Sequence, residues 1–144
     1  MDDVTLNIYI ISRLTHGFYA RELSRLGISM AQFPYVMAVI ERDGISQEKL
    51  SRLLRMGKST TATVIKELVN KGLITREVDE KDRRNFKLHA SPEAVALKPE
   101  IEAVVAHCNR LITENISDPE KFCGLLAEVR NNAERELGGK CIEI

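Results

Sequence analysis

Tryptophan is absent from the 144 residues, and aromatic side chains make up only 5% of them. This scarcity argues against a platform for single-stranded nucleic acid, on which exposed rings stack against successive bases. No apolar run approaches the roughly 18 residues that a membrane span needs. The acidic Asp2 and Asp3 argue against a secretory signal, whose first residues are basic. We therefore expect a cytoplasmic protein with no membrane partner.

Metal-ligand and catalytic spacings are missing as well. The three cysteines are an odd number without a CxxC pair, so neither a disulfide framework nor a zinc site is expected. Cys108 and Cys123 fall on apolar faces of expected helices, where a thiol packs as a small hydrophobe. Oxidation of either one, or of Cys141, stays open as the alternative. No catalytic serine, cysteine–histidine or paired-carboxylate motif occurs, which disfavours an enzyme and predicts no cofactor.

The formal net charge is zero, yet charge is unevenly distributed along the chain. Residues 49–90 carry a net charge of +6, whereas residues 1–48 carry −2 and residues 91–144 carry −4. A basic lobe that faces a polyanion, held by less basic elements, would produce this pattern. A chance fluctuation along a solvated surface is the alternative.

Apolar residues at steps of three and four, bounded by caps and glycines, predict a mainly helical chain. The expected helices cover residues 4–26, 29–42, 46–54, 58–71, 91–116 and 118–137, and two strands cover 73–78 and 85–89. Ser29 and Gln32 are expected to form a capping box at the start of the second helix. Pro34 sits late for a first-turn proline, so a distorted or shifted start is the alternative. The connection Arg55-Met56-Gly57 joins two short helices with helix-turn-helix spacing. Because the two strands follow as a hairpin, the expected fold class is α+β, a winged helix-turn-helix.

The first helix and the last two carry longer apolar stripes than one small lobe can cover. A helical dimer interface is the natural outlet for this surface. Packing of the three helices against one another within a single chain is the alternative.

The most specific sequence motifs lie within residues 45–91. They are Ile45 to Leu54 in the first helix-turn-helix element, Lys58-Ser59-Thr60 at the start of the second, Asn70 to Arg76, Asp79-x-x-Asp82-Arg83-Arg84 at the hairpin tip, and Leu88-x-x-Ser91 at the hairpin exit. In these segments, and in element order over almost its whole length, the chain resembles the MarR family of bacterial and archaeal transcription regulators.

This resemblance implies one MarR-type domain over residues 1–144, with a winged helix-turn-helix DNA-binding lobe at residues 30–90. It implies an obligate homodimer formed by helices within residues 1–27 and 92–144. Such a dimer would bind double-stranded DNA with a pseudo-palindromic operator, as a repressor. A small aromatic or phenolic effector that releases the DNA is implied as a further partner. The first helix has no cysteine, so the peroxide-sensing variant with a cysteine there is not expected.

The candidate DNA contacts fall into three groups. Phosphate contacts are expected from Arg52, Arg55, Lys58 and Lys66, base contacts from Ser59, Thr60 and Thr63, and minor-groove contacts from the wing residues Arg83 and Arg84, with Asp82 orienting a neighbouring arginine. Thr61 is expected to pack inward, because it replaces an apolar position of the family. A solvated surface without DNA contacts is the alternative for all of these side chains. The alternative function is a winged-helix protein-interaction module, which needs no basic recognition helix.

Overall fold

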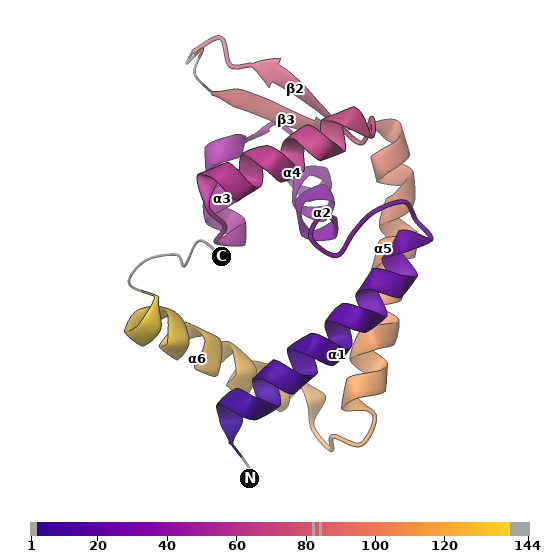
Figure 1. The fold of residues 1–144 in the computed structure, drawn as a ribbon, viewed down its shortest axis with the longest axis vertical. Coiled ribbons are helices and arrows are strands. Elements are labelled where there is room, and N and C mark those ends of the chain that lie inside the picture. The colour runs from indigo at the N-terminus through magenta and orange to yellow at the C-terminus, as the bar shows by residue number, and fades with distance from the viewer. Residues whose placement is uncertain (1–2, 82, 84, 139–144) are drawn as a thin grey trace. The chain divides into compact units, whose positions relative to one another are not determined.

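The computed structural model describes residues 3–81, 83 and 85–138 of the chain. Its elements, in chain order, are α1 (Val4–Ser24), α2 (Phe33–Glu41), β1 (Ile45–Ser46), α3 (Gln47–Leu54), α4 (Lys58–Asn70), β2 (Ile74–Val78), β3 (Phe86–Ala90), α5 (Pro92–Thr113) and α6 (Pro119–Leu137) (Figure 1). The expected α+β class, mainly helical with a small antiparallel sheet, is confirmed. The chain divides into two compact units, one ending at Cys108 within α5 and the other starting at Asn109.

Polar caps set two of the helix starts that the sequence predicts. Ser46 precedes α3, and its hydroxyl oxygen accepts the backbone N–H of Lys49 at 3.2 Å. Ser91 precedes α5 in the same way and accepts the N–H of Ala94 at 3.1 Å. Each cap satisfies one of the N–H groups that the first helical turn leaves without an intrahelical acceptor.

The start of α2 is shifted, as the alternative based on Pro34 predicts. The capping box was expected to begin the helix after Ser29, but residues 29–32 form a turn and α2 begins at Phe33. Half of the predicted pairing is present, since the Gln32 side chain accepts the Ser29 N–H at 3.1 Å. Pro34 explains the shift. In a helix begun at Ser29 it would interrupt the hydrogen-bond ladder, whereas in the first turn of α2 its missing N–H costs nothing.

The sheet has the strand order β1-β3-β2, with both pairings antiparallel. Strands β2 and β3 form the predicted hairpin, in a register that runs from Ile74 opposite Ala90 to Val78 opposite Phe86. Strand β1 was missed, because its two residues are too few to show an alternating pattern. It attaches the hairpin to the start of α3 by pairing Ile45 with Leu88.

The core of the first unit gathers apolar side chains from α1, α2, α3, α4, α5 and the sheet. The largest side chains that are almost completely buried are Leu23, Tyr35, Leu50, Ile65, Leu68, Ile74, Leu88 and Ile101. Three of them, Leu50, Ile65 and Leu68, belong to α3 and α4, so the core fixes which faces of the two helices turn outward. Within the described ranges, no helix is long and apolar enough to cross a membrane.

Helix α6, in the second unit, has no buried residue. Its apolar stripe lies open, with Leu125, Leu126 and Val129 exposed by 51%, 43% and 38%. The two described cysteines differ for this reason. Cys108 on α5 is buried as predicted, but the core position expected for Cys123 is wrong, because α6 leaves it exposed. Cys141 lies outside the described residues.

Candidate nucleic-acid interface

The turn between α3 and α4 holds the two helices in helix-turn-helix geometry. It is made by Arg55, Met56 and Gly57, and the N–H of Met56 donates to the carbonyl of Ser51 at 2.9 Å. Arg55 has a positive φ of 57° and ends α3 in the left-handed region. The left-handed conformation costs a residue with a Cβ roughly 1–2 kcal/mol. It is therefore not expected at an arginine, and the sequence pattern does not predict it. The left-handed backbone of Arg55 sets the direction in which the chain enters α4, whose first residue is Lys58.

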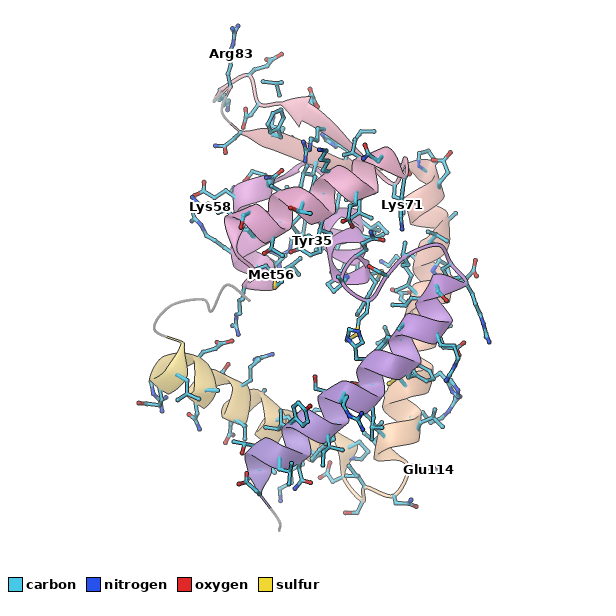
Figure 2. The ribbon with its side chains drawn as sticks, in the orientation of Figure 1. Tyr35, Met56, Lys58, Lys71, Arg83 and Glu114 are labelled. Carbon is cyan, nitrogen blue, oxygen red and sulfur yellow. The ribbon has the colours of Figure 1, made fainter. Side chains whose placement is uncertain are left out.

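The buried and exposed faces of α4 separate clearly. Thr61, Val64, Ile65 and Leu68 point into the core, and the prediction that Thr61 packs inward is confirmed by its complete burial. Its hydroxyl lies 3.4 Å from that of Tyr35, the side chain at the centre of Figure 2.

The outward face of α4 carries three of the predicted contact residues. Ser59, Thr63 and Lys66 are exposed and stand at helical steps of four and three, so they lie along one face. The Thr63 hydroxyl donates to the carbonyl of Ser59 at 3.1 Å. This bond occupies its proton and leaves the oxygen lone pairs and the methyl group for a partner. Lys58 is also exposed and projects from the start of the helix (Figure 2).

Thr60 lies on the flank of α4 rather than on this outward face. It is exposed, but it also lines a mainly apolar cavity of about 190 Å³ together with Pro34, Tyr35, Leu54 and Met56. The cavity is bounded by α2, the end of α3 and the start of α4. A base contact from Thr60 stays a prediction, and the same side chain belongs to the wall of a small pocket.

One carboxylate that the sequence reasoning missed lies among the predicted phosphate contacts. Glu48 accepts a hydrogen bond from the Arg52 guanidinium at 2.6 Å, and its same oxygen lies 3.6 Å from the Lys58 ammonium. The bond from Arg52, with the charges of Arg52 and Lys58, holds the pKa of Glu48 below its usual value. The spacing of four residues between Glu48 and Arg52 was a signal that could have found the pair.

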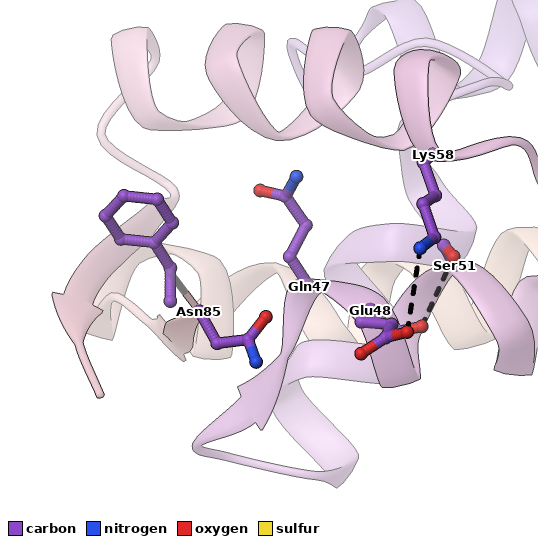
Figure 3. Close-up of a pocket in the computed structure, with 6 residues that line it drawn as sticks. Gln47, Glu48, Ser51, Lys58 and Asn85 are labelled. Atoms are coloured by element: carbon purple, nitrogen blue, oxygen red, sulfur yellow. Dashed lines mark hydrogen bonds and ion pairs between the residues drawn. The ribbon is translucent and has the colours of Figure 1, made fainter. Parts of the chain in front are cut away.

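Figure 3 shows Glu48 and Lys58 of this cluster, which line a polar cavity of about 240 Å³. Its lining comes from α3, the start of α4 and the end of the wing hairpin nearest its tip: Gln47, Glu48, Ser51, Lys58, Asn85 and Phe86. Polar groups from three separate elements therefore converge on one hollow beside the outward face of α4.

The wing is the hairpin formed by β2 and β3. Arg83 at its tip is exposed and projects away from the sheet (Figure 2), and it lines a shallow hollow with Glu77, Val78 and Glu80. The predicted wing residues Asp82 and Arg84 lie outside the described residues.

The base of the wing is tied to the loop after α2 by a histidine between two carboxylates. His89 on β3 lies with Nδ1 at 2.9 Å from Asp43 and with Nε2 at 3.2 Å from Glu77. Gly44, next to Asp43, has a φ of 79°, a left-handed backbone that favours glycine. Asp43, mainly through its hydrogen bond, and Glu77 favour the charged imidazolium, so the pKa of His89 is raised above its usual value.

Replacing His89 is expected to remove a pH-dependent part of the stability. A raised folded pKa stabilises the fold fully below the unfolded value of about 6.5, and this gain is lost as pH rises through the folded pKa. The urea midpoint of His89→Gln should therefore fall furthest below that of the wild type at pH 5.5 and approach it at pH 8.5. The exposed His16→Gln is the matched control. Parallel pH profiles for wild type and His89→Gln would contradict the assignment.

The structure thus brings Arg52 and Lys58 together around Glu48, and it aligns Ser59, Thr63 and Lys66 on one face. The other described candidates, Arg55, Thr60 and Arg83, are also exposed. Over the parts of the chain that the structure describes, no cluster of three histidine, cysteine or acidic side chains could hold a metal ion.

Comparison with known proteins agrees with this geometry. Residues 26–85 match the model of the MarR family. The chain is similar to the HTH-type transcriptional regulator YybA of Bacillus subtilis, with 28% identity over 138 residues that cover 94% of this chain and 92% of the relative.

Two solved structures illustrate the likeness of fold. A MarR transcriptional regulator from Methanosarcina mazei Go1 superposes with a TM-score of 0.84 at 27% identity, covering 92% of this chain and 96% of that one. A MarR family protein from Listeria monocytogenes, solved in complex with a 26mer DNA, gives a TM-score of 0.83 at 26% identity, covering 92% and 90%.

Proposed function

We propose, from the premise that the chain belongs to the MarR family of transcriptional regulators, that it is a cytoplasmic, homodimeric repressor of a pseudo-palindromic operator. Members of this family are DNA-binding regulators and not enzymes. The observation that carries the proposal is the outward face of α4, where small polar side chains are flanked by the cations of α3, α4 and the wing. A recognition helix of this kind reads base edges in the major groove.

Among the proposed contacts, those to phosphates supply affinity and those to base edges read the DNA sequence. Ser59, Thr63 and, from the flank, Thr60 are the base-reading side chains, because their short hydroxyls let the helix approach the groove closely. The phosphate contacts come from Arg52, Arg55, Lys58 and Lys66, and the wing contacts from Arg83 and Arg84 with Asp82 as the orienting group. Phosphate contacts hold the protein on any duplex and position the reading helix.

The domain assignment follows the same division. Residues 30–90 form the DNA-binding lobe, and helices within residues 1–27 and 92–144 form the dimer interface. The exposed apolar side chains of α1, among them Ile8, Ile11 and Leu14, support this assignment, since a soluble monomer rarely leaves such a stripe open.

Release by a small aromatic or phenolic acid is the regulatory part of the proposal. The apolar cavity beside Thr60 supports it, because its walls include both the core residue Tyr35 and the start of the recognition helix. An occupant there would favour positions of α4 that differ from the DNA-bound one. Titration of salicylate against the DNA complex tests this part, and an unchanged affinity would leave a repressor without this effector.

The test of the DNA assignment is a salt series with Lys58→Ala and Arg84→Ala, using the promoter DNA of the protein's own gene. Each variant removes one phosphate or groove cation per protomer. The slope of log affinity against log salt should fall by about 0.9 for each phosphate that the variant no longer neutralises, or about 1.8 per dimer. Lys121→Ala on α6 is the control, which should keep the wild-type slope. If both variants bind like the wild type throughout the series, the DNA-binding assignment is wrong.

A further inference from the structure

We infer that Glu48 is a positioning residue that sets the DNA affinity, because its carboxylate competes with DNA phosphates for Arg52 and Lys58. The inference rests on the proposed function and goes beyond it, since none of the expected contacts includes an acidic residue on the helix-turn-helix. In the protein without DNA, the Glu48 carboxylate occupies the position that a phosphate oxygen takes when the protein binds a duplex.

The competing carboxylate of Glu48 lies where α3 and the start of α4 meet. Glu48 stands in the first turn of α3, on the helix that ends in the left-handed Arg55, and Lys58 is the first residue of α4. One oxygen, Oε1, lies 2.6 Å from the Arg52 guanidinium and 3.6 Å from the Lys58 ammonium. Both helices of the motif thus direct a cation to the same acceptor.

The exposure of the three side chains shows that this cluster belongs to the binding surface and not to the core. The Arg52 and Lys58 side chains are exposed by 71% and 80%, and Glu48 by 37%. Ion pairs this exposed contribute little to folding stability. They are therefore easily exchanged for other ion pairs, which fits contact with a mobile or incoming anion better than a structural brace.

DNA binding exchanges one anion for another at this point. Arg52 and Lys58 leave the carboxylate and pair with phosphates, while Glu48 keeps a negative charge beside the polyanion. Each protomer therefore gains less DNA affinity from Arg52 and Lys58 than two cations without a neighbouring carboxylate would supply. Removal of the Glu48 charge should make all duplex binding tighter, and it should raise the number of counterions released.

The experiment compares Glu48→Gln with Glu100→Gln on a random-sequence duplex over a salt series. Gln keeps the size of the side chain and removes the charge. Glu100 is exposed on α5, outside the basic segment, so its variant has the same net charge as Glu48→Gln without touching the cluster. At 0.1 M salt, charges further than about 10 Å from a phosphate are largely screened, so the control should bind like the wild type.

We expect Glu48→Gln to bind about three- to tenfold more tightly than Glu100→Gln. The salt slope should steepen by up to about 1.8 per dimer. In an Arg52→Ala and Lys58→Ala background the same substitution should have a smaller effect, because only the direct repulsion between Glu48 and the phosphates remains. A purely structural role of Glu48 would not predict this difference. Circular dichroism of all variants checks that α3 is intact.

The outcomes separate this inference from the proposed function. A wild-type protein that binds no duplex would overturn the proposed function. A wild-type protein that binds, with a Glu48→Gln variant equal to or weaker than Glu100→Gln, would overturn the inference and leave the function standing. An effect of Glu48→Gln that persists unchanged without Arg52 and Lys58 would also overturn it.

Discussion

Leu126→Glu on α6 is expected to turn the protein into a monomer and to weaken operator binding by about 10²–10⁴-fold. The side chain is 43% exposed in the single chain and lies on the stripe with Leu125 and Val129. In the proposed dimer this stripe is covered, so a carboxylate there would lose its hydration without gaining a partner. Loss of the dimer separates the two recognition helices, and the gain from binding two linked half-sites is then lost.

Analytical ultracentrifugation and operator titration measure the two effects in parallel. Asn131→Glu is the matched control, because it adds the same acid to α6 about 140° around the helix axis from Leu126. It should stay dimeric and keep its operator affinity. A Leu126→Glu protein that sediments as a dimer and binds the operator normally would place the dimer interface elsewhere.

The helices and the hairpin could be predicted because each has a strong local signal. Apolar side chains at helical spacing, a Ser46 or Ser91 cap and a Gly72 with a φ of 72° after α4 are local, and they fixed the element order. Strand β1 was missed because a long-range contact decides it. The pairing of Ile45 with Leu88 creates β1 in two residues, and no local pattern can show it.

Two further positions differ from what the residue type or its helical spacing suggests. Arg55 adopts a left-handed backbone that glycine usually takes, although Gly57 stands two residues away. Cys123 has the same helical spacing as a core residue, but a stripe on α6 is buried only if another element covers it. Periodicity predicts which face is apolar; it does not tell whether the covering partner is the same chain or a second copy.

The candidate interface was predicted as a set of cations and short hydroxyls with one orienting acid, Asp82, and this left out Glu48. Charge summed over residues 49–90 identified a basic segment but counted Glu67, Glu77 and the others only as subtractions. In the structure, the location of an acidic side chain matters more for the interface than the count of acidic residues in the segment. Glu48, outside that segment by one residue, lies closest to two of the predicted phosphate contacts.

Leu68→Ala is expected to destabilise the fold by about 2–5 kcal/mol while leaving the base-reading surface unchanged. Leu68 is completely buried and lies on the inner face of α4, opposite the residues proposed to contact DNA. Its truncation removes the transfer free energy of the deleted methyl groups and leaves a cavity that a packed core fills only in part. Such a loss is a large share of the roughly 5–15 kcal/mol that stabilises a typical domain.

Urea unfolding of Leu68→Ala and of Lys66→Ala, two positions on the same helix, separates the core from the surface. The exposed Lys66 variant should change stability by no more than about 0.5 kcal/mol, yet it should lower the salt slope of DNA binding. Leu68→Ala should show the reverse, with a large loss of stability and, well below its unfolding transition, an operator affinity close to that of the wild type. If Leu68→Ala instead weakened DNA binding as strongly as Lys66→Ala while it stayed fully folded, the inner and outer faces assigned to α4 would be wrong. The recognition face would then have to lie elsewhere on the lobe.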